Sequence, residues 1–163
     1  MHKTSAWPLA LVYVGLIVYA SLYPFTEWRY QGIVSWAFLS AGWPKYWTGF
    51  DVVSNVLGYG PFGFLLALSA LRTERGHWAV TGATAVAALL SFSMESLQGF
   101  LPSRVPSNVD LGLNVMGAWA GAMLAWSLEK LGVIDRWSQF RARWFVAQAQ
   151  GGLVLLALWP VAL

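Results

Sequence analysis

Two short polar patterns of the same type recur in this otherwise apolar chain, in Asp51–Gly58 and Asp110–Gly117. Each has an aspartate, an asparagine four residues later, then valine, an aliphatic residue and glycine. Residues four apart share one face of a helix, about 6 Å apart along its axis. Such carboxylates and carboxamides can bind a cation, accept hydroxyl groups or act as general acids and bases. The four candidate site residues in these patterns are Asp51, Asn55, Asp110 and Asn114.

Four further polar residues lie between the two patterns, and we add them to the predicted ligand-binding site. They are Glu95, Gln98, Arg104 and Ser107. Polar and charged residues in membrane segments are rare and mark functional sites. At about 1.5 Å per residue, a helix starting near Trp78 places Glu95 close to the outer boundary of a membrane core about 30 Å thick. All eight residues can therefore meet at one level if the helices form a bundle, with Arg104 as the expected ion-pair partner of Glu95.

The absence of other reactive residues limits the chemistry of this site. The chain has no cysteine, and its two histidines, His2 and His77, lie on the opposite, predicted inner side. Histidine-based hydrolysis and histidine-ligated metals are therefore not expected at the site, and we predict no metal and no cofactor. The sequence shows no nucleophile–base pair either. Asp51 and Asp110 also have a simpler interpretation, since an acid in the first turn of a helix complements the helix dipole.

Composition places these residues in a membrane protein. Of the 163 residues, 58% are hydrophobic and only 10% charged, whereas soluble domains are about a quarter charged. Five apolar runs have the length of a spanning helix, which is about 20 residues. They cover residues 7–23, 52–71, 78–97, 111–128 and 145–163. We predict an all-α polytopic transmembrane bundle with four to five spanning helices: a four-helix membrane domain over 1–144 and a fifth, possibly truncated, helix over 145–163.

Two connecting segments are expected at the membrane surface. Residues 25–50 are rich in tryptophan and tyrosine, which favour the membrane–water interface. Residues 129–143 combine apolar residues at helical spacing with three arginines, which predicts an interfacial helix facing anionic lipid headgroups. Membrane lipids are therefore expected partners. The ten basic residues are too scattered to suggest nucleic acid.

The distribution of basic residues predicts the orientation. With the N-terminus inside, seven Lys and Arg residues fall in cytoplasmic segments and three in outer segments. This asymmetry follows the positive-inside rule. The eight candidate residues then lie near the outer face of a cytoplasmic (inner) membrane.

Glycines accompany both polar patterns and predict close contact between the two helices that carry them. They are Gly58, Gly60, Gly63, Gly117 and Gly121. Small residues allow helix backbones to approach closely inside a membrane.

At these residues the chain resembles the VanZ-like family of small membrane proteins, over roughly residues 10 to 130. The resemblance rests on the Asp51–Asn55 pattern with Gly58 and Pro61, on Glu95-x-x-Gln98, and on the spacing from Arg104 through Ser107 to Gly117. Members carry His or Lys near the start of the second helix, whereas this chain has Asp51 there. The resemblance implies an integral cytoplasmic-membrane protein of a family linked, in some members, to glycopeptide (teicoplanin) resistance.

Three hypotheses for function follow. In the first, which the sequence favours, a non-enzymatic protein binds an envelope lipid, cell-wall precursor or glycopeptide-like ligand at the outer leaflet. In the second, an enzyme acts on a lipid-linked substrate, with Glu95 or Asp110 as general acid or base and Arg104 holding an anionic group. In the third, the polar residues only fix the packing of the helices.

Overall fold

The structure, a computed structural model, describes residues 5–43, 48–73 and 76–144, with side chains to residue 140. The helices are α1 (Ala6–Leu22), α2 (Gly49–Leu71), α3 (Ala79–Gln98), α4 (Asn108–Lys130) and α5 (Val133–Trp144), with two short 3-10 turns, η1 (Ala37–Ser40) and η2 (Gly76–Trp78). No strand occurs in these ranges, so the predicted all-α fold is confirmed. The fifth apolar run, residues 145–163, lies outside the described residues.

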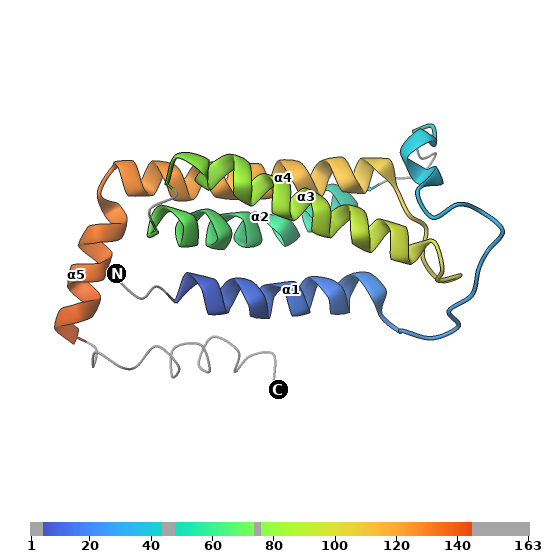
Figure 1. The fold of residues 1–163 in the computed structure, drawn as a ribbon, viewed down its shortest axis with the longest axis horizontal. Coiled ribbons are helices and arrows are strands. Elements are labelled where there is room, and N and C mark those ends of the chain that lie inside the picture. The colour runs from blue at the N-terminus through green and yellow to red at the C-terminus, as the bar shows by residue number, and fades with distance from the viewer. Residues whose placement is uncertain (1–4, 44–47, 74–75, 145–163) are drawn as a thin grey trace.

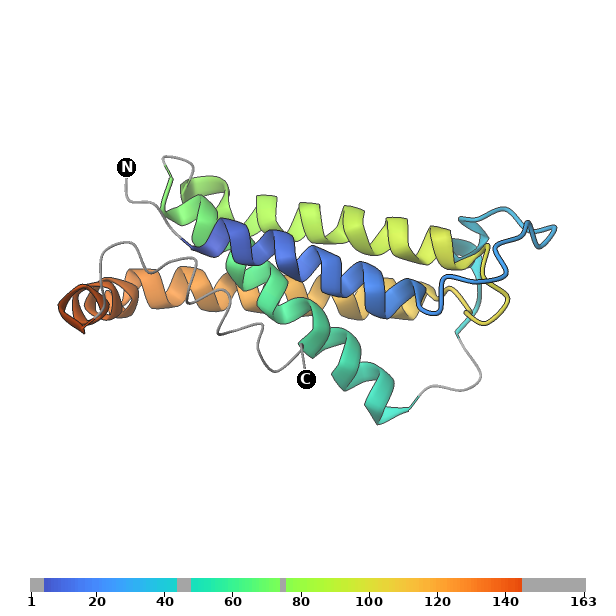
Figure 2. The same cartoon turned by 90° about the horizontal axis from the view of Figure 1, so that it is seen from below.

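The first four helices run alternately up and down along one axis, and α5 turns across the end of the bundle (Figure 1). α1 and α3 end where α2 and α4 begin; we call this the cleft end. The opposite end, where α5 lies, is called the α5 end. Figure 2 shows the first half of α2 leaning away from the other helices at the cleft end. This arrangement brings the start of both Asp-x-x-x-Asn patterns to the same end of the molecule.

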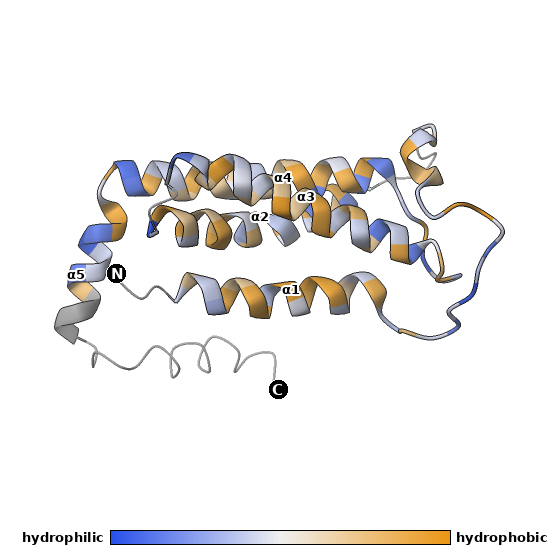
Figure 3. Ribbon diagram, viewed as in Figure 1, coloured by the Kyte–Doolittle hydropathy of each residue, from blue (hydrophilic) through white to orange (hydrophobic). Residues whose placement is uncertain are grey.

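The bundle has the surface of a membrane protein. Among the described residues, three helices are long and apolar enough to cross a membrane: α2, the helical stretch Gly76–Gln98, and α4; α1 is a shorter apolar helix. Large apolar side chains near the middle of these helices point outward, with Leu57 65%, Leu89 67% and Met116 62% exposed. Figure 3 shows the hydrophilic residues collected at the two ends and on α5. Outward apolar side chains at this depth are stable in lipid and not in water.

Glycines hold α2 and α4 together at the middle of the bundle. The backbone of Gly121 contacts that of Gly60, and Gly117 lies against Val56, so closely that an added Cβ at either glycine would overlap the facing carbonyl oxygen. The predicted glycine contact is therefore confirmed here. Gly58 differs, since nothing lies within 4 Å of its Cβ position. It borders open space beside the site.

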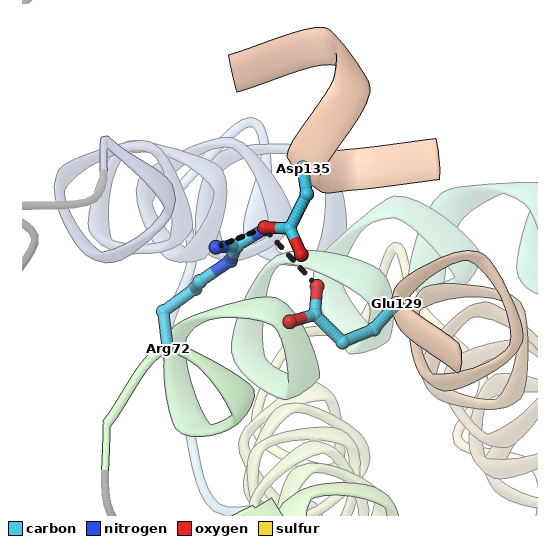
Figure 4. A network of polar contacts seen from close by, with 3 residues as sticks. All are labelled: Arg72, Glu129 and Asp135. Atoms are coloured by element: carbon cyan, nitrogen blue, oxygen red, sulfur yellow. Dashed lines mark ion pairs between the residues drawn. The ribbon is translucent and has the colours of Figure 1, made fainter. Parts of the chain in front are cut away.

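An ion-pair network joins three helices at the α5 end. Arg72, just after α2, lies 3.1 Å from Glu129 of α4 and 2.9 Å from Asp135 of α5 (Figure 4). One guanidinium therefore bridges two carboxylates and links the direction of α5 to α2 and α4. The helix predicted within 129–143 is present as α5, and it exposes Trp137 and Phe140.

The aromatic segment between α1 and α2 lies across the cleft end. Its tryptophans at 28, 36 and 43 are 44%, 61% and 79% exposed, whereas Phe38 is buried against Phe92 of α3. The backbone N–H of Arg29 donates to the carbonyl of Phe100 at 3.0 Å. This hydrogen bond holds the segment against the connection after α3. Its residues 44–47 lie outside the described part of the chain.

Candidate functional site

A polar cleft with a volume of about 510 Å³ opens at the cleft end. It is lined by residues of α1, α2, α3, α4 and the connection before α4. Seven of the eight predicted site residues line it: Asp51, Asn55, Glu95, Gln98, Arg104, Asp110 and Asn114. The eighth, Ser107, is not among the lining residues. Binding sites for small molecules typically have volumes of about 300–1,000 Å³, so a lipid headgroup fits within this space.

Asp51 forms the cap at the start of α2. Its Oδ2 accepts hydrogen bonds from the backbone N–H of Thr48 at 2.7 Å and from the Thr48 hydroxyl at 2.9 Å. The Thr48 hydroxyl accepts in return from the N–H of Asp51, which completes a capping box. The capping interpretation of Asp51 is therefore confirmed. Its second carboxylate oxygen keeps free lone pairs beside the cleft.

Glu95 connects the end of α3 to the start of α4. Its side chain is only 4% exposed, and Oε2 accepts a hydrogen bond from the backbone N–H of Ser107 at 2.8 Å. The Ser107 hydroxyl accepts from the N–H groups of Val109 and Asp110, so Ser107 is the N-cap of α4. Ser107 thus positions Glu95 and Asp110 without reaching the cleft itself.

The expected ion pair between Arg104 and Glu95 is not made. The Arg104 guanidinium instead donates to the carbonyls of Ala20 and Tyr23, each at 2.9 Å from one terminal nitrogen. Gln98 donates similarly to the carbonyl of Ser21 at 3.0 Å. The last carbonyls of a helix have no partner within it and carry partial negative charge, so they attract donors and cations. Arg104 and Gln98 therefore fix the end of α1.

Asn114 is buried at the inner end of the cleft. It is 4% exposed, and its Nδ2 donates to the hydroxyl of Ser91 on α3 at 2.9 Å. Its carbonyl oxygen, Oδ1, has no hydrogen-bond partner. The buried hydroxyl of Tyr59, which also lines the cleft, makes no hydrogen bond of ordinary length, although it interacts with Ser91. Buried polar atoms are nearly always paired, so an unpaired acceptor here indicates a place where a ligand or water binds.

Asp110 lies at the centre of the acidic part of the cleft. Its carboxyl group interacts with the Asn55 side chain and lies close enough to Asp51 and Glu95 to feel their charges. The site therefore combines three carboxyl groups with two carboxamides. Within the described residues, no three acidic or histidine side chains are grouped so as to hold a metal ion. The arrangement can bind a donor group or move a proton.

Sequence reasoning missed two buried residues of this site, Tyr59 and Ser91. Both carry a positional signal. Tyr59 follows Asn55 by four residues and Ser91 precedes Glu95 by four, so each shares a helix face with a predicted site residue. For that reason, the hydroxyl groups of Tyr59 and Ser91 could have been included in the predicted site.

Fold and surface together define a multi-pass helical membrane protein with a polar cleft at one end of the bundle. Residues 6–129 match the model of one protein family, described as VanZ/LLP1. The match covers most of the chain, which therefore belongs to the VanZ/LLP1 family, as the resemblance predicted. No curated protein and no solved structure is detectably similar to it.

Proposed function

We propose that this VanZ/LLP1 protein binds the polar head of an envelope lipid, a cell-wall precursor or a glycopeptide-like ligand, and that this binding contributes to glycopeptide (teicoplanin) resistance. The observation that carries the proposal is the cleft itself. Seven predicted polar residues, drawn from three helices and a loop, line one opening at the end of an apolar bundle. In an inner membrane with the N-terminus inside, this opening faces outward, where cell-wall precursors are assembled.

The unpaired atoms in the cleft favour binding over a purely structural role. Polar groups that only fix helix packing are expected to satisfy one another in a dry core. Glu95 and Gln98 do find partners in the protein, but Oδ1 of Asn114 does not. A buried acceptor without a partner costs free energy in the empty protein. A bound ligand that donates a hydrogen bond to this acceptor removes that cost.

The enzyme hypothesis has less support from the geometry. Glu95 is held by the Ser107 N–H, and Arg104 donates to carbonyls of α1. Arg104 is thus engaged elsewhere instead of being directed at an anionic substrate group. Asp110 is the remaining candidate acid or base, and among the described residues it makes no hydrogen bond to the serine or tyrosine hydroxyls that line the cleft.

One set of variants tests whether the cleft is needed for resistance separately from whether it is needed for folding. The full chain is expressed in a teicoplanin-susceptible bacterium, and wild type is compared with Asp110→Asn and Asn114→Leu. The inhibitory concentration of teicoplanin and the thermal stability of each purified protein are measured. We expect the wild type to raise the inhibitory concentration and both variants to lose that effect while remaining folded.

Two results would count against the proposal. Unchanged resistance in both variants would show that the cleft is not involved. Turnover of a lipid-linked precursor by purified protein, lost in Asp110→Asn, would favour the enzyme hypothesis instead.

A further inference from the structure

The geometry points to a specific ligand chemistry: we infer that the cleft binds a primary ammonium group through Asp110, Asn114 and Asp51. This inference rests on the proposed function and names the class of group that the cleft recognises. An ammonium group of this kind occurs in ethanolamine headgroups and in the free amines of cell-wall peptides. Both sources share the same charge and the same three N–H donors.

The first supporting observation is the unpaired carbonyl oxygen of Asn114. The residue is 4% exposed and lines the cleft, and its amide nitrogen is already bonded to Ser91. The Nδ2–Ser91 bond indicates that the oxygen, an acceptor, is the atom left without a partner. A ligand that completes this site must therefore bring a donor.

The second observation is the charge of the cleft. Asp110 lies close enough to Asp51 and to Glu95 to interact electrostatically with each, so three carboxyl groups line one cleft. Their partners among the described residues leave lone pairs free: Thr48 holds one oxygen of Asp51, Ser107 holds one oxygen of Glu95, and Asn55 interacts with Asp110. Neighbouring like charges repel, and a cation placed among them removes that repulsion.

The third observation concerns the donors in the cleft. Arg104 and Gln98 direct their N–H groups at the carbonyls of α1, the arginine through Nε and a terminal nitrogen. A phosphate or carboxylate entering the cleft would meet three carboxyl groups and would find the Gln98 amide and two of the three Arg104 nitrogens already bonded to carbonyls near the end of α1. The part of the ligand that enters is therefore the cationic donor, with any anionic group remaining at the rim.

An organic cation also fits better than a metal ion. The described acidic side chains are not grouped closely enough to form a metal site. The cleft volume of about 510 Å³ far exceeds that of one ion and suits an ammonium group with its carbon chain. Charge-assisted N–H···O bonds to such a group are stronger and shorter than neutral ones.

Binding of matched amines by the purified full chain tests this inference. Isothermal titration calorimetry in a neutral detergent compares short-chain phosphatidylethanolamine with phosphatidylcholine, whose nitrogen has no N–H, and with phosphatidylglycerol. A soluble arm compares a lysine-containing peptide with its ε-acetylated form, and a third arm uses Ca²⁺ alone. Asp110→Asn is the site variant, and Glu27→Gln is the control, because Glu27 is exposed at the same end and does not line the cleft.

We expect an ammonium-bearing ligand to bind on the order of tenfold or more tightly than its methylated or acetylated counterpart. Asp110→Asn should lose this preference and Glu27→Gln should keep it. Preference for the lipid amine identifies a headgroup ligand, and preference for the peptide amine identifies a cell-wall peptide. Asn114→Leu, checked for folding by circular dichroism, gives a second test if Asp110→Asn fails to fold.

Two outcomes would overturn the inference in different ways. If Asp110→Asn weakens binding but ethanolamine and choline lipids bind equally, or phosphatidylglycerol or Ca²⁺ binds best, the ammonium assignment is wrong and the cleft remains a binding site. If none of the lipids or peptides binds, the proposed function fails together with it.

Discussion

The two ends of the bundle use charged residues in opposite ways. At the α5 end, one arginine, Arg72, pairs with two carboxylates within 3.1 Å, so opposite charges meet within the protein. At the cleft end, three carboxyl groups gather, while the nearby Arg104 is turned toward helix carbonyls. Charges paired with opposite charges inside the protein contribute to its fold, whereas a group of like charges in a cleft is available to a ligand. We therefore propose a structural role for the α5 end and a binding role for the cleft end.

The glycine contact between α2 and α4 lies between these two ends, and it holds together the two helices that contribute residues to both of them. The predicted effects of substitution therefore fall in a definite order. Changes at the glycine contact should act on the whole fold. Loss of the Ser91–Asn114 bond should cost less stability, changes at the α5 end less again, and Asp110→Asn should act on binding with little effect on stability.

The largest effect is expected from Gly121→Ala. Its Cβ would overlap the carbonyl oxygen of Gly60, so α2 and α4 must separate, and overpacking of this kind costs about 3 kcal/mol of unfolding free energy. Gly112→Ala is the matched control, because nothing lies within 4 Å of that position on the same helix. Reversible unfolding in mixed micelles measures both. Equal stability of the two variants would contradict the close contact.

Ser91→Ala should have the next largest effect. It removes the one hydrogen-bond partner that the Asn114 side chain has among the described residues, at a cost of about 1–2 kcal/mol. Asn114→Leu removes the unpaired group as well and should cost less than about 1 kcal/mol. The same unfolding measurement compares the unfolding free energies of Ser91→Ala and Asn114→Leu. A larger loss for Asn114→Leu would mean that this asparagine is a structural residue.

Arg72→Gln should have a smaller, salt-dependent effect. The ion pairs are partly exposed, so their loss should lower stability by about 1 kcal/mol at low salt and less at high salt. Spin labels on α4 and α5 should also report a broader distance distribution. Arg136→Ala, an exposed arginine on α5 outside the network, is the control. An unchanged distribution in Arg72→Gln would show that other contacts fix α5.

The fold could be predicted from sequence far better than the pairing of polar groups. Each of the first four apolar runs became a helix within a few residues of its expected ends, because the need to satisfy the backbone in lipid leaves few alternatives. The cap that Ser107 forms on α4 likewise depends on local chemistry. Such features depend on residues close together in the chain.

Partners distant in the chain could not be predicted. Arg104 was paired with Glu95, but its partners are carbonyls of Ala20 and Tyr23, more than 80 residues earlier. Backbone carbonyls leave no mark in a sequence, since every residue has one. The bond between Asn114 and Ser91 likewise depends on the relative rotation of two helices, which hydropathy does not specify.

The most direct test compares Asp110→Asn with Arg72→Gln in one experiment that measures both headgroup binding and the unfolding temperature. The account predicts that Asp110→Asn loses binding and keeps its unfolding temperature. It predicts that Arg72→Gln keeps binding and unfolds at a lower temperature. If the two properties fall together in both variants, the division of roles between the ends of the bundle is wrong.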